Sequence, residues 1–332
     1  MATQLLAAAG ANYYMDVCLN TDRMLAYFDT SGHDNQTLRE VQGRLPAPEF
    51  LKWGLQREIF SRDEQGNVIR GPQWGDPRQF CQSDAEFQEL LSSTPAAYGF
   101  DTAGSRPANA VTRQMRLHQG VGREAIHAEL RVDELQRIAS FRVVETEARS
   151  KDSHLSSPDL GSRLTLESLN KLSPDGQSVQ ILVSDGLSAE AVHHNLPDLL
   201  PVLLDGLAGR GTKPGQPILA RYGRVKLAEQ IAQQLQADLI IHLIGERPGG
   251  DALASRSLSA YLVYRLGDPE TQREAARFSG NAAMRFEYTV ISNIYSAGLP
   301  PAEAAGLILE KVGEILARKA AGNRLEALLK ML

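Results

Sequence analysis

The chain has 332 residues, of which 42% are hydrophobic and 23% are charged, and its formal net charge at pH 7 is −5. This length suffices for two domains with buried cores, so folding needs neither disulfides nor a metal. The negative charge gives no long-range attraction to nucleic acid or to an anionic membrane, and we expect neither as a partner. The two cysteines, Cys18 and Cys81, form no CxxC pair, which argues against a zinc ribbon or a thiol redox centre.

The sequence contains no stretch of the roughly 20 apolar residues that a membrane-spanning helix requires. Its longest apolar stretches, residues 196–204 and 239–244, are too short. The N-terminus also lacks the basic start and the long apolar segment of a signal peptide. We therefore expect a cytoplasmic protein.

Residues 1–90 are rich in aromatic and turn-forming residues and do not have the pattern of a complete domain. Residues 11–19 predict a buried strand, because they are short, apolar and partly aromatic. Asn20-Thr-Asp22 predicts the start of a helix that carries Met24, Leu25 and Tyr27. Pro46-Ala-Pro48 predicts the start of a second helix.

Residues 91–175 form a second region that we expect to be mainly helical. Val111 and Met115 are four positions apart, and residues 132–138 repeat an amphipathic spacing.

Residues 176–332 give the clearest pattern in the chain. Near-continuous apolar strands at residues 179–183, 218–222 and 239–244 alternate with helices, and a final long helix follows Pro300-Pro301. Strands of this kind are typical of a parallel sheet covered on both faces. The sequence therefore predicts an α/β, Rossmann-like domain.

The loops after the three strands are the candidate binding segments. Because the carboxyl ends of parallel strands share one edge, we expect residues 184–186, 222–225 and 245–249 to meet there. The free amides where Arg221-Tyr-Gly-Arg-Val225 enters a helix suit a polar ligand atom, although the segment also fits a plain glycine turn. Glu246 can accept from ligand N–H groups or pair with Arg247. Together these features favour a neutral, amide-rich ligand.

Other motifs do not indicate a catalytic or metal site. Gly206-Leu-Ala-Gly-Arg-Gly211-Thr-Lys213 lacks the order of a phosphate-binding loop and follows a helix, so we interpret it as a helix end. No GxGxxG follows a strand, and the seven histidines have no metal-binding spacing. We expect His242, inside an apolar strand, to be a hydrogen-bonded core residue.

A series of short motifs runs in order through the longer C-terminal part of the chain. They are Ser93-Thr-Pro-Ala-Ala97, Ala125-Ile-His-Ala128, Pro158-Asp-Leu-Gly161, Val183-Ser-Asp-Gly-Leu-Ser188, Arg221-Tyr-Gly-Arg-Val225, Gly245-Glu-Arg-Pro-Gly249, Ile291-Ser-Asn-Ile294 and Gly298-Leu-Pro-Pro-Ala-Glu-Ala-Ala305. With them, residues 91–332 resemble the small subunit of the adenosylcobalamin-dependent ethanolamine ammonia-lyases.

The N-terminal part carries a different set of motifs. They are Ala9-Gly-Ala-Asn-Tyr-Tyr-Met-Asp16, Asn20-Thr-Asp-Arg-Met-Leu25, Gly32-His-Asp34 and Pro46-Ala-Pro-Glu-Phe50. With them, residues 1–90 resemble the C-terminal end of the large subunit of the same enzyme, the tail of a TIM barrel.

The resemblance implies a division of labour between two subunits. In the family, a large TIM-barrel subunit holds ethanolamine, and a small Rossmann-like subunit covers the cobalamin from the other side. Adenosylcobalamin, bound base-on with its own dimethylbenzimidazole, supports the radical conversion of ethanolamine to acetaldehyde and ammonia. The resemblance thus implies a cytoplasmic protein, either free or packaged in a bacterial microcompartment.

The resemblance also implies cofactor contacts at individual positions. Val225 and Glu246 match family contacts, Val290 stands where the family has a cysteine, and Met24 matches a large-subunit methionine near the corrin. Two departures accompany these matches. Most of the barrel has no counterpart here, so we expect a partner to supply it, and residues 267–289 are longer than the family pattern, with a polar helix around residues 270–277.

We therefore expect three regions: a large-subunit-like segment at residues 1–90, a helical region at residues 91–175 and a cobalamin-binding domain at residues 176–332. The expected function is that of a cobalamin-binding lyase subunit. A non-catalytic cobalamin-binding or assembly protein is the main alternative, and a nucleotide-binding Rossmann protein is a third.

Overall fold

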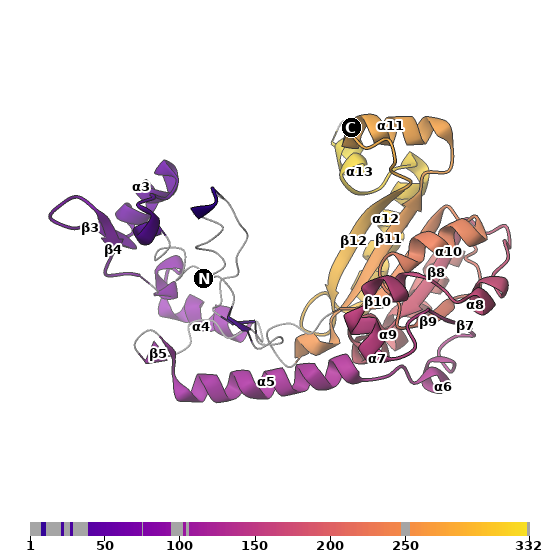
Figure 1. Ribbon diagram of the computed structural model, residues 1–332, viewed down its shortest axis with the longest axis horizontal. Helices are drawn as coiled ribbons and strands as arrows, with labels where there is room; N and C mark the ends of the chain where they lie inside the picture. The colour runs from indigo at the N-terminus through magenta and orange to yellow at the C-terminus, as the bar shows by residue number, and fades with distance from the viewer. Residues whose placement is uncertain are drawn as a thin grey trace. The chain divides into compact units, whose positions relative to one another are not determined.

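The computed structural model describes residues 8–10, 21–22, 27–28, 39–74, 76–93, 102–103, 106–246 and 253–330. The chain divides into two compact units, residues 1–120 and residues 121–332, whose elements are labelled in Figure 1. The boundary falls within helix α5 (Asn109–His127).

The first unit consists of short helices and two-stranded antiparallel sheets. Its remaining elements are β1 (Thr21–Asp22), β2 (Tyr27–Phe28), α3 (Pro48–Gln56), β3 (Phe60–Arg62), β4 (Val68–Arg70), η1 (Pro77–Phe80), α4 (Asp84–Ser92), β5 (Thr102–Ala103) and β6 (Arg106–Pro107). Leu51, Phe60 and Val68 form a small buried cluster between α3 and the β3–β4 hairpin. A core of this size contributes little stability by itself.

The predictions for this unit are confirmed in part. Helix α3 begins at Pro48, as the Pro46-Ala-Pro48 signal predicts, because the fixed φ of proline suits a first turn. The prediction that a helix carries Tyr27 is wrong, because Tyr27 pairs with Asp22 in an antiparallel ladder. The pairing of β1 with β2 therefore outweighs the tendency of Asn20-Thr-Asp22 to start a helix. Residues 11–19 and Met24 lie outside the described residues.

The second unit is built on a six-stranded sheet in the order β12-β11-β10-β8-β9-β7. Its strands are β7 (Arg142–Glu145), β8 (Val179–Ser184), β9 (Ile218–Arg221), β10 (Leu239–Gly245), β11 (Leu258–Arg265) and β12 (Phe286–Ile294). The four strands from β7 to β10 are parallel, while β11 is antiparallel to both of its neighbours. The predicted α/β class is therefore confirmed, but the sheet is mostly rather than wholly parallel, since β11 is antiparallel to β10 and β12.

Three of the six strands differ from the sequence predictions. Strand β7 comes from the region expected to be mainly helical, and it pairs in parallel with β9 at the edge of the sheet. Strands β11 and β12 were not predicted, and they extend the sheet as an antiparallel edge. Figure 1 shows these two strands as the longest pair in the unit.

Helices cover both faces of the sheet, since successive side chains of each strand point to opposite faces. Ile181 and Ile241 pack with α9 and α12 on one face, and Leu182 and Ile240 pack with α10 on the other. The helices of this unit are α6 (Val132–Leu135), α7 (Lys151–Ser156), η2 (Pro158–Ser162), α8 (Leu166–Asn170), α9 (Ala189–Gly209), α10 (Leu227–Leu235), η3 (Leu253–Arg256), α11 (Pro269–Ser279), α12 (Pro301–Arg318) and α13 (Gly322–Leu329).

The predicted ends and faces of the long helices are also confirmed. Helix α12 begins at Pro301 and buries the predicted face, including Ile308 and Ile315. Helix α9 ends at Gly209, so the glycine-rich segment is a helix end and loop before β9. In the part of the chain that the structure describes, no helix combines the length and apolar composition required to cross a membrane.

The long segment at residues 267–289 contains the predicted polar helix, α11. The Asp268 carboxylate caps it by accepting from the amides of Glu270 and Thr271. A buried ion pair ties the end of this segment to α13: Arg324 donates from Nε to Glu287 Oε1 at 2.7 Å and from Nη2 to Glu287 Oε2 at 2.8 Å. The segment is thus joined to the C-terminal helices.

Removing one member of this pair should destabilise the second unit. Arg324→Leu leaves the Glu287 carboxylate, which is 8% exposed, without its charged partner, and we expect a loss of about 3 kcal/mol in the free energy of unfolding. Both tryptophans lie in the first unit, so urea unfolding should be followed by far-ultraviolet circular dichroism.

The control is Arg277→Leu, which replaces an exposed arginine on α11 and should change stability by less than about 0.5 kcal/mol. The double variant Glu287→Leu/Arg324→Leu should recover much of the loss. If Arg324→Leu were as stable as the Arg277→Leu control, the stabilising role assigned to the Arg324–Glu287 ion pair would be wrong.

Candidate functional site

The predicted loops meet at one edge of the sheet, which we call the carboxyl rim: residues 184–186, 221–225 and 245–246. The amide of Leu187 donates to the carbonyl of Gly245 at 2.9 Å, and the amide of Gly223 donates to Asp185 Oδ1 at 3.3 Å. Two backbone-anchored contacts therefore join the three loops. Residues 247–249 of the third loop lie outside the described residues.

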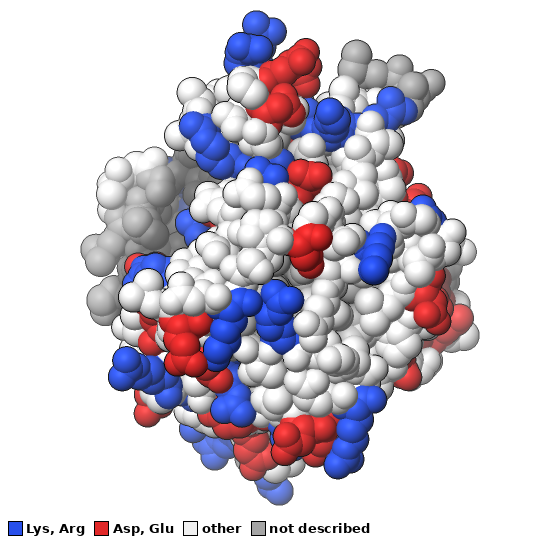
Figure 2. Space-filling view, turned by 90° about the vertical axis from the view of Figure 1, so that its right-hand side faces the viewer, with Lys and Arg blue, Asp and Glu red and all other residues white. Residues whose placement is uncertain are grey.

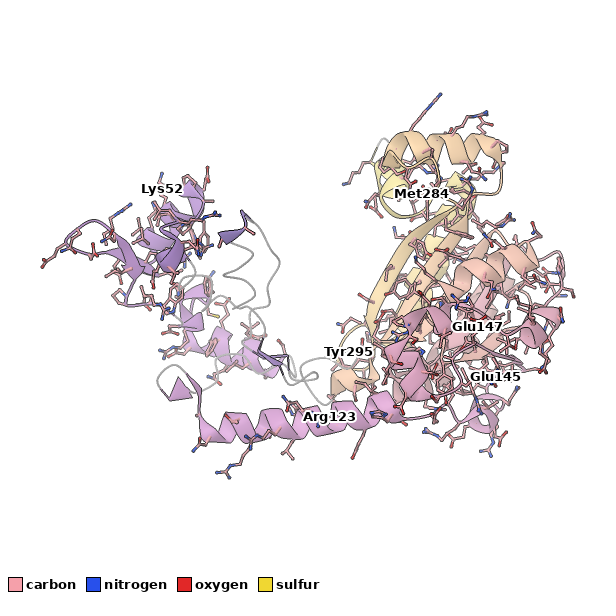
Figure 3. The ribbon with its side chains drawn as sticks, in the orientation of Figure 1. Lys52, Arg123, Glu145, Glu147, Met284 and Tyr295 are labelled. Carbon is pink, nitrogen blue, oxygen red and sulfur yellow. The ribbon has the colours of Figure 1, made fainter. Side chains whose placement is uncertain are left out.

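Strand β12 also ends at this rim, because it runs parallel to β10 across the antiparallel β11. Tyr295, which directly follows β12, marks the rim in Figure 3, and Met284 marks the opposite end of the strand.

Glycine is required where the first and third loops touch. Gly186 has a positive φ of 52°, and a Cβ there would lie 2.2 Å from the Gly245 carbonyl oxygen. A Cβ on Gly245 would lie 2.0 Å from the Ser188 carbonyl oxygen. Both contacts are with backbone, so no side-chain movement relieves them.

A buried carboxylate holds the first two loops together. Asp185 Oδ2 lies 3.2 Å from the ammonium group of Lys151 on α7, and both side chains are buried. The same ammonium lies 5.7 Å from the ring centroid of Tyr222. Burial raises the pKa of Asp185, while Lys151 and the Gly223 amide favour its charged form.

The second loop is also fixed from the side of α7. Arg224 donates from Nη2 to the His154 carbonyl at 2.6 Å, and its backbone amide donates to the Gly161 carbonyl at 2.8 Å. The His154 ring is fully buried, and neither of its nitrogens has a hydrogen-bond partner among the described residues. Burial, assisted by Arg224 and Lys151, lowers the pKa of His154 to about 4, so the ring is neutral near pH 7.

Val225 lies half-buried at the end of the second loop, just before α10. Below it, His242 Nε2 lies 2.8 Å from Ser184 Oγ, which confirms the predicted hydrogen-bonded core histidine. Burial lowers the pKa of His242 to about 3, and the backbone of Val225 opposes this shift. His242 is therefore a neutral, buried ring at the end of the neighbouring strand pair β8–β10.

Glu246 and Val290 are brought together by a residue that the sequence prediction missed. The Tyr261 hydroxyl donates to Glu246 Oε1 at 3.0 Å, and Tyr261 lies directly opposite Val290 in the β11–β12 ladder. Val290 is 48% exposed. The apolar–aromatic alternation of residues 258–265 was the available signal, but pairing partners across strands are not encoded locally. The fourth predicted residue, Met24, lies outside the described residues.

A pocket of about 470 Å³ lies beside the carboxyl rim, at the ends of β7 and β9. It is lined by Glu145, Thr146, Ala148, Arg149, Thr165, Glu167, Ser168, Lys171, Arg221 and Tyr222. Glu145, the last residue of β7, is labelled in Figure 3. Tyr222 belongs to both the pocket wall and the second loop.

On the face of the second unit drawn in Figure 2, basic and acidic side chains are interspersed, and neither sign of charge forms a continuous surface. Among the described residues, no group of three or more histidine, cysteine, aspartate or glutamate side chains is placed to hold a metal ion.

Comparisons with known proteins identify both parts of the chain. Residues 84–326 match the family model of the ethanolamine ammonia-lyase light chain, and residues 1–69 match that of the ethanolamine ammonia lyase large subunit. An ethanolamine ammonia-lyase small subunit from Clostridium tetani is 34% identical over 241 residues, covering 71% of this chain and 76% of the relative. One from Fusobacterium nucleatum is 35% identical over 246 residues, covering 73% and 77%. Both resemblances expected from the motifs are confirmed.

The buried neutral His154 should make the second unit sensitive to acid. Its pKa is about 4 when folded, against a usual 6.5, so the unfolded state binds more protons between these values and stability falls as the pH falls. One such histidine contributes about 1.4 kcal/mol per pH unit in this window. His154→Phe keeps an aromatic ring beside Tyr222 and should reduce the slope by that amount.

Urea unfolding between pH 7 and pH 4.5 measures the slope, and at pH 8 the two proteins should differ by less than about 1.5 kcal/mol. An unchanged slope in His154→Phe would show that His154 is not the titrating group.

Proposed function

The chain belongs to the ethanolamine ammonia-lyase light-chain family, and we propose that it is the adenosylcobalamin-binding subunit of such a lyase. The observation that carries this proposal is that the carboxyl rim includes both Val225 and Glu246, and that Tyr261, which donates to Glu246, pairs with Val290 in the neighbouring strand. In the proposed complex, one edge of the Rossmann-like sheet of the second unit faces the cofactor, because open α/β sheets commonly bind ligands beyond the carboxyl ends of their strands.

The residues of the rim fit a large, neutral, amide-bearing ligand. Tyr261 occupies Glu246 Oε1, which leaves Oε2 to accept from an amide N–H of the corrin periphery. Val290, 48% exposed, and Val225 supply apolar contact for the corrin. The bound cofactor supplies the radical chemistry, while the protein positions and shields it.

The environment of the histidines supports binding of the cofactor base-on. The described rim segments contain no histidine, and His154 and His242, which contact the rim residues Arg224 and Ser184, are both fully buried. Neither reaches the surface to coordinate cobalt. Dimethylbenzimidazole of the cofactor itself is therefore the axial ligand that we propose.

A large subunit is the proposed partner. Residues 1–69 match the large-subunit family model, and we propose that this segment corresponds to the end of a TIM barrel. An eight-stranded barrel takes about 250 residues, so we assign the ethanolamine site to a large subunit that supplies the rest. The proposed location is the cytoplasm, with packaging in a bacterial microcompartment as a further possibility to be tested by fractionation.

The test uses the full chain co-expressed with a large subunit from a related enzyme. We expect the complex to bind adenosylcobalamin, followed by visible absorbance, and to release acetaldehyde and ammonia from ethanolamine. Val225→Arg places an unpaired charge where the corrin is proposed to make an apolar contact, and it should weaken cobalamin binding roughly 100-fold. Glu246→Ala removes one charged acceptor and should weaken it about tenfold or more.

Val202→Arg is the matched control, because Val202 is 43% exposed on α9 rather than at the rim. It should leave the Kd for cobalamin unchanged. Binding without acetaldehyde, with any large subunit tried, would favour the non-catalytic cobalamin-binding or assembly protein. A complex that binds no cobalamin would contradict the proposal.

A further inference from the structure

We propose that Tyr261 is a positioning residue, which orients the Glu246 carboxylate so that its second oxygen accepts a hydrogen bond from an amide N–H of the cofactor. This inference rests on the proposed function and assigns a role to a residue that the sequence motifs did not single out.

The position of Tyr261 on the sheet is the first observation. Tyr261 lies opposite His242 on β10 and opposite Val290 on β12, so the three side chains form a row on one face. His242 pairs with Ser184, the last residue of β8, at 2.8 Å, and Val290 is exposed. The row therefore places Tyr261 between two proposed cofactor contacts, Glu246 and Val290.

The second observation is the way Glu246 is held. Its backbone amide donates to the Ser257 carbonyl at 3.0 Å, and its Oε1 accepts from the Tyr261 hydroxyl at 3.0 Å. Glu246 makes no other side-chain hydrogen bond or ion pair within the described ranges. One carboxylate oxygen is thus occupied, and among the described residues none occupies Oε2.

The tyrosine hydroxyl is a constant donor in this arrangement. Burial, assisted by the charge of Glu246, raises the pKa of Tyr261 to about 12. The hydroxyl therefore stays protonated through the neutral range and continues to donate to the carboxylate. A free glutamate side chain samples many rotamers, and ordering it before the ligand arrives reduces the entropy lost on binding.

A carboxylate held in this way accepts hydrogen bonds and donates none. The proposed subsite therefore recognises the N–H of a primary amide and disfavours a carboxylate at the same place, since two negative charges would face each other. Primary amides are the side chains that cobalamin presents around its corrin ring, so the subsite matches the proposed cofactor.

A double-mutant cycle on the complex with the large subunit tests the proposal, with the Kd for adenosylcobalamin read from visible absorbance. Tyr261→Phe should weaken binding about three- to tenfold, the effect of one lost hydrogen bond. Glu246→Ala should weaken it more. The double variant should bind no more weakly than Glu246→Ala, because a residue that acts through Glu246 adds nothing once Glu246 is gone.

Tyr288→Phe is the matched control. Tyr288 lies two residues before Val290 on β12, and its hydroxyl likewise donates to a carboxylate, that of Glu229 on α10. Its loss should leave the Kd for cobalamin within twofold of the parent value. The melting temperatures of the two phenylalanine variants identify any general loss of folding.

The outcomes distinguish a failure of the positioning role of Tyr261 from a failure of the proposed cofactor site. Additive effects in the double variant, or an unchanged Kd in Tyr261→Phe while Glu246→Ala binds weakly, would overturn the positioning role and leave the cofactor site intact. A parent-like Kd in Glu246→Ala would overturn both the positioning role and the assignment of Glu246 to the cofactor site.

Discussion

The buried carboxylate of Asp185 is the contact on which the candidate site depends. It pairs with Lys151 and accepts the amide of Gly223, so one side chain at the end of β8 holds both α7 and the loop after β9. Removing a charge from water is costly unless the partners are well placed. The Lys151–Asp185 pair therefore fixes the shape of the loop that ends in Val225.

The carboxyl rim combines this fixed loop with a second support on the other side of β10. Tyr261 comes from the antiparallel edge of the sheet and holds Glu246, while His242 lies between the two supports as a buried neutral ring. Sites built on rigid strands hold their side chains more precisely than sites on free loops. A surface ordered in this way loses little conformational freedom when it binds a ligand.

The sequence predicted three of the four parallel strands, β8, β9 and β10, since uninterrupted apolar segments such as that of β10 are typical of strands covered on both faces, but it missed β7. It also placed Val225 and Glu246 at a common edge, because that inference needs only strand order and direction. Val290 was found through the family resemblance alone. Lys151 and Tyr261 could not be predicted, because their roles depend on pairing between segments far apart in the chain.

Hydrogen–deuterium exchange on the complex with the large subunit, with and without adenosylcobalamin, tests the central claim most directly. The claim is that the carboxyl rim holds the cofactor. Cobalamin should slow amide exchange in the segments around Val225 and Glu246 and near the end of β12, and should leave α11 and α13 unchanged. Protection confined to α11 and α13, or no protection anywhere in the second unit, would contradict the account.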